Sequence, residues 1–168
     1  EGIIKEKSKL PQALDKNGLV ILNWEDKFVR QMALGIKAKV LFYGLDKKHC
    51  DFWAEKIKVN FKGNSFVMGC KVGKIFLTTG LIGSHFVQAC LAAAAVGLNQ
   101  GLSLKEIKNG LTKLKPLTGR LSIEKGPLGT ILLDDSLRAN PASTLAGLQV
   151  LSDLSHSETR SRSARSVA

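Results

Sequence analysis

The fold class is decided by one stretch, Leu132-Leu133-Asp134-Asp135-Ser136-Leu137-Arg138-Ala139-Asn140-Pro141. The apolar run before and within it, residues 129–133, predicts a short buried strand. Two carboxylates end that strand, and Asn140 is expected to be the N-cap of a helix that begins at Pro141. Acidic residues between the carboxyl end of a strand and a helix N-terminus lie where open α/β sheets bind nucleotides. A surface turn made of ordinary turn residues explains the same segment equally well.

The composition indicates a folded chain with a strongly basic surface. Of 168 residues, 44% are hydrophobic, which is enough to bury a core. The net charge of +11 would attract nucleic acid, anionic membranes or phosphorylated small molecules without choosing among them. The lysines are scattered and no RNA-binding motif is present, so a solvated basic surface is the preferred interpretation and nucleic acid is disfavoured as a partner.

Cellular location is inferred from what the sequence lacks. No apolar run is long enough to span a bilayer, and no signal peptide precedes the first predicted element. The three cysteines form no CxxC pair, so neither a zinc site nor a disulfide framework is expected. Reduced thiols in a cytoplasmic protein fit this pattern. A chain that begins at Glu1 without methionine also suggests a fragment or a processed product.

The order of the predicted elements indicates an α/β fold. A strand–helix–strand pattern over residues 18–45 predicts a parallel sheet, and alternating residues punctuated by glycines over 53–79 predict antiparallel hairpins. A buried helix is expected over 84–98, and the capping box Ser103–Glu106 begins another that ends near Leu114. We therefore predict a mostly parallel sheet with an added antiparallel part and helices packed on it.

The chain is expected to divide near residue 116. A first part spans residues 1–115, a linker spans 116–120, and a second part over 121–154 contains a hairpin and the helix from Pro141. The Ser- and Arg-rich residues 155–168 lack apolar periodicity and predict a disordered or foreign tail.

Three motifs together carry a resemblance to a known family. They are Gly83-Ser84-His85-Phe86-Val87-Gln88-Ala89-Cys90-Leu91-Ala92-Ala93, Pro116-Leu117-Thr118-Gly119-Arg120 and Asp134-Asp135-Ser136-Leu137-Arg138-Ala139-Asn140-Pro141. In this order and spacing they resemble the Mur ligases. The resemblance implies the second half of a Mur-ligase-like central ATPase domain, followed by the first strands and helix of a Rossmann-like C-terminal domain.

The implied chemistry is ATP-dependent amide-bond formation between a carboxylate and an amine, through an acyl phosphate, in peptidoglycan precursor synthesis. The Asp-Asp-Ser-x-x-Ala-Asn-Pro pattern is most similar to the family member that adds D-Ala-D-Ala to a UDP-MurNAc-tripeptide. The cofactors would be ATP and Mg²⁺. Two alternatives stay open: a ligase similar to folylpolyglutamate synthase, and a non-catalytic basic module that binds nucleic acid or a partner protein.

The resemblance also implies site residues. Arg120 would act at the domain hinge near the ATP phosphates, and Asp135 would accept hydrogen bonds from ribose. Lys7 would be a second catalytic residue and, only if carbamoylated, a magnesium ligand. The remaining residues that match nucleotide-binding positions are Asn23, His85, Ser136 and Asn140. Each has a plain alternative as a surface, capping or helix-terminal residue.

Some positions depart from the family pattern. Phe86 and Ala89 replace the two asparagines on the adenine side of the site, and Leu137-Arg138 replace Tyr-Asn on the substrate side. The phosphate-binding loop G-x-x-x-x-G-K-[ST] is absent, since the segment Gly69–Ile75 has one residue too few and ends in isoleucine. A hairpin explains that segment better, and the chain alone is predicted to be inactive.

Overall fold

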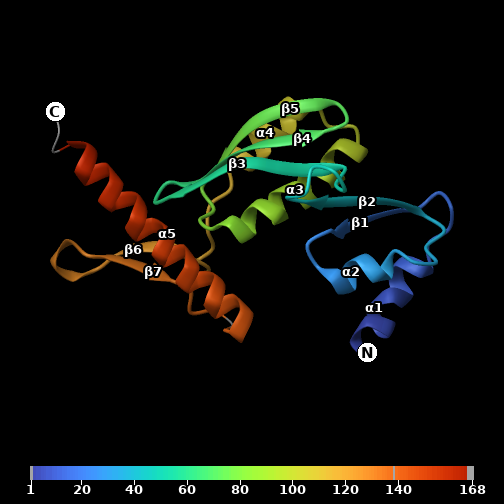
Figure 1. Ribbon diagram of the computed structural model, residues 1–168, viewed down its shortest axis with the longest axis horizontal. Helices are drawn as coiled ribbons and strands as arrows, with labels where there is room; N and C mark the ends of the chain where they lie inside the picture. Colours follow the sequence, from blue (N-terminus) through green and yellow to red (C-terminus); the bar gives the residue numbers. More distant parts are fainter. Residues whose placement is uncertain (1, 138, 166–168) are drawn as a thin grey trace.

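The computed structural model describes residues 2–137 and 139–165, with side chains described as far as Ser155 (Figure 1). The elements, in chain order, are α1 (Gly2–Gln12), β1 (Leu19–Asn23), α2 (Lys27–Met32), β2 (Lys39–Gly44), β3 (Phe52–Asn60), β4 (Gly63–Cys70), β5 (Gly73–Thr79), α3 (Ser84–Asn99), α4 (Leu104–Thr112), β6 (Ser122–Lys125), a 3₁₀ turn (Pro127–Gly129), β7 (Ile131–Asp134) and α5 (Pro141–Arg165). The predicted α/β class is confirmed.

The main sheet has five strands in the order β1-β2-β3-β4-β5. The pairs β1–β2 and β2–β3 are parallel, whereas β3–β4 and β4–β5 are antiparallel. The change of direction follows from the connections. Residues 24–38, which contain α2, form a crossover that returns the chain to the same end of the sheet, and tight turns join the later strands. The prediction of a parallel part with added hairpins is confirmed.

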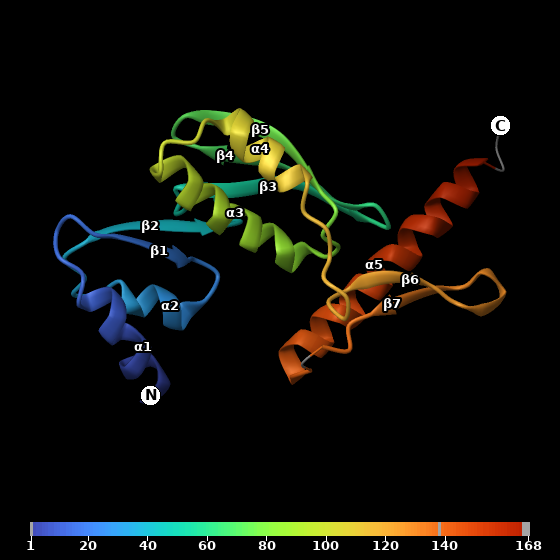
Figure 2. The same cartoon turned by 180° about the vertical axis from the view of Figure 1, so that it is seen from behind.

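The main core lies between the sheet and α3, as Figures 1 and 2 both show. Phe66, Met68 and Leu77 from the strands meet Val87 and Leu91 from α3, and all five are fully buried. Burying side chains of this size stabilises the fold by about 2 kcal/mol each. The predicted capping box is present, because Ser103 and Glu106 exchange hydrogen bonds at the start of α4. The core therefore fixes α3 firmly on the sheet.

A second, smaller packing unit follows the segment 116–120. Strands β6 and β7 form a separate two-stranded antiparallel sheet, and α5 packs on it through Val150 and Leu154. These two residues join Leu121 and Ile82 in a small core that also contacts the end of β3. The change of layer lies where the sequence predicts the linker, although the division into domains stays a prediction.

Two features of this second unit differ from the sequence prediction. Strand β7 is not buried, because Ile131 and Leu132 are each 51% exposed. The described residues supply one partner strand and one covering helix, which leave much of its surface open. Helix α5 continues to Arg165, where a disordered or foreign tail was predicted from residue 155. Residues 155–165 contain no glycine or proline that would end the helix. Residues 166–168 lie outside the described part. The foreign origin of the tail stays a prediction.

All three cysteines are free and buried. Burial raises the pKa of Cys50 and of Cys90 to about 11, and the negative charge of Glu25 adds to the effect at Cys50. Because the thiolate is the reactive form, both residues are expected to react with iodoacetamide at pH 8 at least about tenfold more slowly in the folded protein than in urea. Peptide mass spectrometry would measure this, and equal rates in the two conditions would contradict it.

Candidate functional site

The candidate site is built where the linker meets the carboxyl end of β7. The Leu137 N–H donates to the Gly119 carbonyl at 2.9 Å, which fixes the acidic loop against the linker. Gly119 has a φ of +76°, and a β-carbon there would lie 3.1 Å from the Leu137 β-carbon. Glycine is therefore favoured here for two reasons: it adopts a positive φ without strain, and it has no side chain that would crowd Leu137.

The two carboxylates of this loop have different tasks. Asp134 closes the turn by accepting hydrogen bonds from the Ser136 hydroxyl and the Ser136 N–H, and these bonds hold its pKa below the ordinary value. Asp135 points towards α5, where a β-carbon on Gly147 would lie 3.0 Å from its Oδ2. Asp134 is thus a structural residue, and Asp135 is left as the acceptor that a ligand could use.

His85 is brought to the same place from the other side of the linker. It lies in the first turn of α3, and its ring contacts Phe86 with centroids 4.4 Å apart. Partial burial lowers the pKa of His85, and the negative charge of nearby Asp135 opposes part of that shift. The structure therefore brings together His85 and Asp135, which are 50 positions apart in the sequence.

Arg120 follows the linker glycine directly. Its N–H donates to the Leu117 carbonyl at 3.0 Å, and this turn holds its backbone beside the acidic loop. The residue is exposed, and its guanidinium has no ion pair within the described part of the chain. An unpaired guanidinium at this position is available for a phosphate group.

Asn140 has the capping role that the sequence predicts. Its Oδ1 accepts from the Ser143 N–H at 3.0 Å, and its own N–H donates to the Ser143 hydroxyl at 3.0 Å. This reciprocal pair begins α5. Its side-chain oxygen is therefore committed to the helix, and Ser136 is committed to Asp134, so neither adds a free oxygen to the site. Arg138, the neighbouring departure from the family pattern, lies outside the described residues.

Asn23, another predicted nucleotide-binding residue, is the last residue of β1. Its Oδ1 accepts from the Glu25 N–H and its Nδ2 donates to Gln88 Oε1, both at 2.9 Å. Gln88 lies on α3 one position before Ala89, so the amide on this face of α3 comes from the preceding residue. Gln88 was not predicted as a site residue, because the family motif leaves its position unspecified.

Lys7 is separated from the other candidates. It lies on α1, at the opposite end of the molecule from α5 in Figures 1 and 2. It lines a mostly apolar cavity of about 480 Å³ with Leu10, Ile21 and Met32 among others. No group of three or more His, Cys, Asp or Glu side chains that could hold a metal occurs within residues 2–137 and 139–155. The roles of Lys7 as a catalytic residue and as a carbamoylated magnesium ligand stay predictions.

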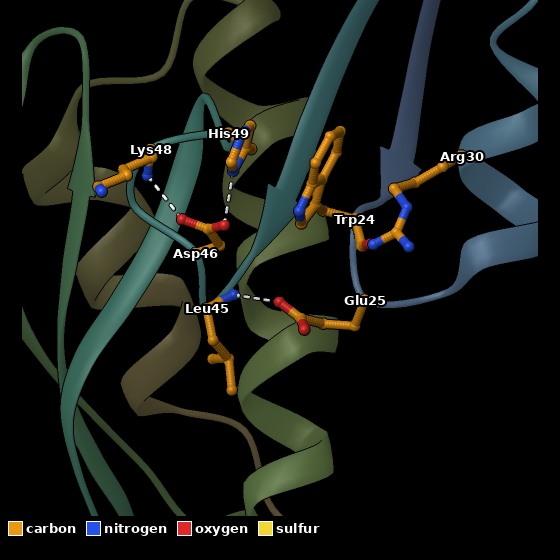
Figure 3. Close-up of polar contacts among 7 residues, drawn as sticks. All are labelled: Trp24, Glu25, Arg30, Leu45, Asp46, Lys48 and His49. Carbon is orange, nitrogen blue, oxygen red and sulfur yellow. Dashed lines mark hydrogen bonds and ion pairs between the residues drawn. The ribbon is translucent and has the colours of Figure 1, made fainter.

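A polar cluster that was not predicted from the sequence lies at the ends of β1 and β2 (Figure 3). Figure 3 shows the Trp24 indole between His49 and Arg30. The His49 ring stacks on the indole at 4.8 Å, with 6° between the planes, and the Arg30 guanidinium lies 5.0 Å from the ring centroid. Asp46 accepts from His49 Nδ1 at 2.6 Å, which helps to hold its pKa below the ordinary value.

Two hydrogen bonds between side chains and backbone groups also fix this second cluster, and the one between Glu25 and Leu45 joins the two loops. Arg30 donates to the Trp24 carbonyl at 2.6 Å, and Glu25 Oε1 accepts from the Leu45 N–H at 2.7 Å. Of the residues in this region, only Asn23, next to Trp24, was predicted as a site residue. The three-residue spacing of Asp46 and His49 after a predicted strand could have indicated that pair, but not its contact with Trp24. The contacts hold the strand-end loops in a fixed arrangement, which explains them without a ligand.

Comparison with known proteins identifies the family. The sequence pattern of the Mur ligase middle domain matches residues 1–97, more than half of the chain. The chain belongs to the Mur ligase family. It is 34% identical over 155 residues to the UDP-N-acetylmuramoyl-tripeptide–D-alanyl-D-alanine ligase of Escherichia coli (strain K12), covering 91% of this chain and 34% of that protein. The ligase of the same name from Mycobacterium bovis is 32% identical over 164 residues, covering 96% and 32%.

Solved structures show the same relationship. A crystal structure of MurF from Acinetobacter baumannii matches with a TM-score of 0.81 and 28% identity, over 90% of this chain and 33% of that one. MurF from Thermotoga maritima in complex with ADP matches with a TM-score of 0.74 and 17% identity, over 89% and 34%, and shows the fold alone. The chain thus spans about a third of the length of the relatives that it matches. No helix within the described residues is long and apolar enough to cross a membrane.

Proposed function

We propose that this chain is the part of a MurF-type ligase that holds the nucleotide between the central domain and the start of the C-terminal domain. The complete reaction would join D-Ala-D-Ala to a UDP-MurNAc-tripeptide at the expense of ATP. The observation that carries the proposal is that the segments containing Arg120, Asp135 and His85 meet at the linker. Identities of 32–34% to ligases of that name support it.

Each converging residue offers a distinct interaction with ATP. The Asp135 carboxylate would accept hydrogen bonds from ribose hydroxyls, because a charged acceptor forms the stronger bonds. The Arg120 guanidinium would bind phosphate oxygens in a two-pronged contact and stabilise the charge that develops during phosphoryl transfer. His85, with its lowered pKa, would meet the nucleotide as a neutral ring beside Phe86, which offers an aromatic surface where the family has an amide.

The described residues support a magnesium site less well than they support a nucleotide site. The described residues contain no cluster of oxygen ligands that would hold the ion, so no step here depends on it. If Mg²⁺ takes part, ATP and residues outside the described part would supply most of its ligands. A carbamate on Lys7 remains the one candidate that the sequence offers. The cytoplasmic location stays a prediction from the sequence.

A folylpolyglutamate-synthase-like ligase is the second candidate. Folylpolyglutamate synthase from Thermotoga maritima matches with a TM-score of 0.68 over 91% of this chain, at 19% identity, which shows a common fold alone. The Asp134–Pro141 segment and the higher identity to MurF-type ligases favour the first candidate. In a ligase that contains this segment, UDP-MurNAc-tripeptide would be consumed with D-Ala-D-Ala, whereas a folate with glutamate would not react.

The test uses the chain itself. We expect it to bind ATP without releasing phosphate, because phosphoryl transfer depends on a phosphate-binding loop that this sequence lacks. Asp135→Ala should weaken ATP binding about tenfold, as expected for loss of a charged hydrogen-bond acceptor. Isothermal titration calorimetry would measure affinity, and a malachite-green assay would measure phosphate.

The matched control is Asp153→Ala, which removes a carboxylate from α5 that accepts from Gln149 instead of facing the linker. This variant should keep wild-type affinity. Equal affinities for Asp135→Ala and the wild-type chain would show that the ribose contact was placed wrongly. ATP-dependent phosphate release that Asp135→Ala abolishes would contradict the prediction of an inactive chain.

A further inference from the structure

We propose a second ligand site, for a small organic phosphate, in the groove between the β4–β5 hairpin and the end of α4. The groove has a volume of about 580 Å³, within the range of small-molecule sites. Residues of the β3–β4 turn, of the β4–β5 hairpin, of the end of α4 and of the short segment before the linker line it. Asp135, Arg120 and His85 do not line it, so it is separate from the candidate nucleotide site.

The charge of the groove is entirely positive. Lys62 lines it from the β3–β4 turn, Lys113 and Lys115 line it from the segment directly after α4, and no aspartate or glutamate is among its lining residues. None of the three lysines has an ion pair with any residue that the structure describes. Three lysines that line one groove without a carboxylate among them favour an anionic occupant, because no carboxylate of the groove neutralises their charge.

The floor of the groove adds hydrogen-bonding groups. Ser65 on β4 and Thr78 on β5 are directly opposite each other in the antiparallel register. Neither hydroxyl has a hydrogen-bond partner in the described part of the protein, whereas the Thr112 hydroxyl nearby already donates to the Lys108 carbonyl at 2.8 Å. Two neighbouring free hydroxyls can donate to the oxygens of one phosphate group.

An aromatic ring indicates that the ligand has an organic part. Phe76 lies two residues before Thr78 on the same face of β5, lines the groove and is 53% exposed. An exposed phenyl ring beside lysines and hydroxyls offers apolar contact to a planar or hydrocarbon group. The combination fits a phosphate ester better than inorganic phosphate.

Occupation of the groove would connect the sheet with the linker. The Gly80 N–H at the end of β5 donates to the Leu114 carbonyl at 3.1 Å, which fixes the point where the linker leaves the first unit. Lys115 is the next residue, and Lys62 contributes from the β3–β4 turn. A phosphate held by both lysines would therefore restrain the start of the linker.

The probe is phenyl phosphate, added to the complete 168-residue chain at constant ionic strength. Binding is expected to shift the backbone amide NMR signals of Gly63 and Gly80, which line the groove, and not that of Ser136. The double variant Lys62→Gln/Lys115→Gln should lose affinity about tenfold or more, because it removes two charged contacts. Lys105→Gln, an exposed lysine at the start of α4 and outside the groove, should stay within about twofold of wild type.

A second comparison tests the aromatic wall. Phenyl phosphate should bind more tightly than inorganic phosphate, and Phe76→Ala should remove the difference. Equal losses in the double variant and in Lys105→Gln would show general attraction to a basic surface and overturn the site. Shifts centred on Ser136 would overturn it too, and would place the probe in the nucleotide site instead. Neither outcome depends on whether the chain binds ATP.

Discussion

Arg120→Ala is expected to lower the turnover of a ligase containing this segment about a hundredfold, while ATP affinity changes by less than about threefold. The reason is that an exposed guanidinium at the linker contributes most when the domains close around the reacting phosphate. In this structure the side chain has no ion pair with a described residue, so its removal leaves no buried charge behind. Steady-state turnover and calorimetric ATP affinity would be measured on the same preparations.

Two further variants separate charge from geometry at this position. Arg120→Lys keeps the positive charge but loses the two-pronged contact, so it should recover only part of the turnover. Lys125→Ala removes an exposed positive charge from the neighbouring hairpin and should leave turnover unchanged. A loss of affinity as large as the loss of turnover would assign Arg120 to ground-state binding. Wild-type turnover in Arg120→Ala would make it a surface residue.

Gly63→Ala is expected to lower the free energy of unfolding by about 3 kcal/mol or more. Gly63 begins β4 with a φ of +122°, and a β-carbon there would overlap the Thr79 carbonyl oxygen on the adjacent strand. The obstacle is backbone within a three-stranded ladder, which cannot move aside as a flexible side chain can. Urea denaturation followed by circular dichroism would give the change in stability.

Two other glycines provide matched controls. Gly73 has a similar φ of +137°, but a β-carbon added there would meet nothing within 4 Å, so Gly73→Ala isolates backbone strain and should cost less. Gly110 lies within α4 with open space around it, and Gly110→Ala should stabilise the protein by about 0.5–1 kcal/mol. A Gly63→Ala variant as stable as Gly73→Ala would show that the close approach to Thr79 carries no cost.

The sequence predicts the elements well where local chemistry decides them. Ser103 and Glu106 exchange the hydrogen bonds of a capping box, and Asn140 caps α5, because each pattern involves residues within one helical turn. The sequence-based prediction was wrong where the structure depends on packing between residues that are far apart in the chain. The exposure of Ile131 depends on how many strands cover β7, and the continuation of α5 depends on a helix supported by Val150 and Leu154 farther back.

The candidate site shows the same division. The family motifs pointed to Arg120, Asp135 and His85, and the structure brings their segments together at the linker. Gln88 and the Trp24–His49 stack were missed, because partners 65 and 25 positions apart leave no periodic signal in a single sequence. Lys7 was placed by sequence order alone, and α1 lies far from the linker.

The arrangement of the main sheet has a consequence for the order of folding. Strands β3, β4 and β5 are joined by the turns Phe61-Lys62 and Lys71-Val72, so their contacts close short loops, whereas β1 must wait for the crossover through α2 to pair with β2. Short loops lose less chain entropy before contacts form, and the hairpins should therefore gain protection before the parallel pair. Pulsed hydrogen exchange would show early protection of Val67 and later protection of Ile21; the reverse order would make the parallel pair the nucleus.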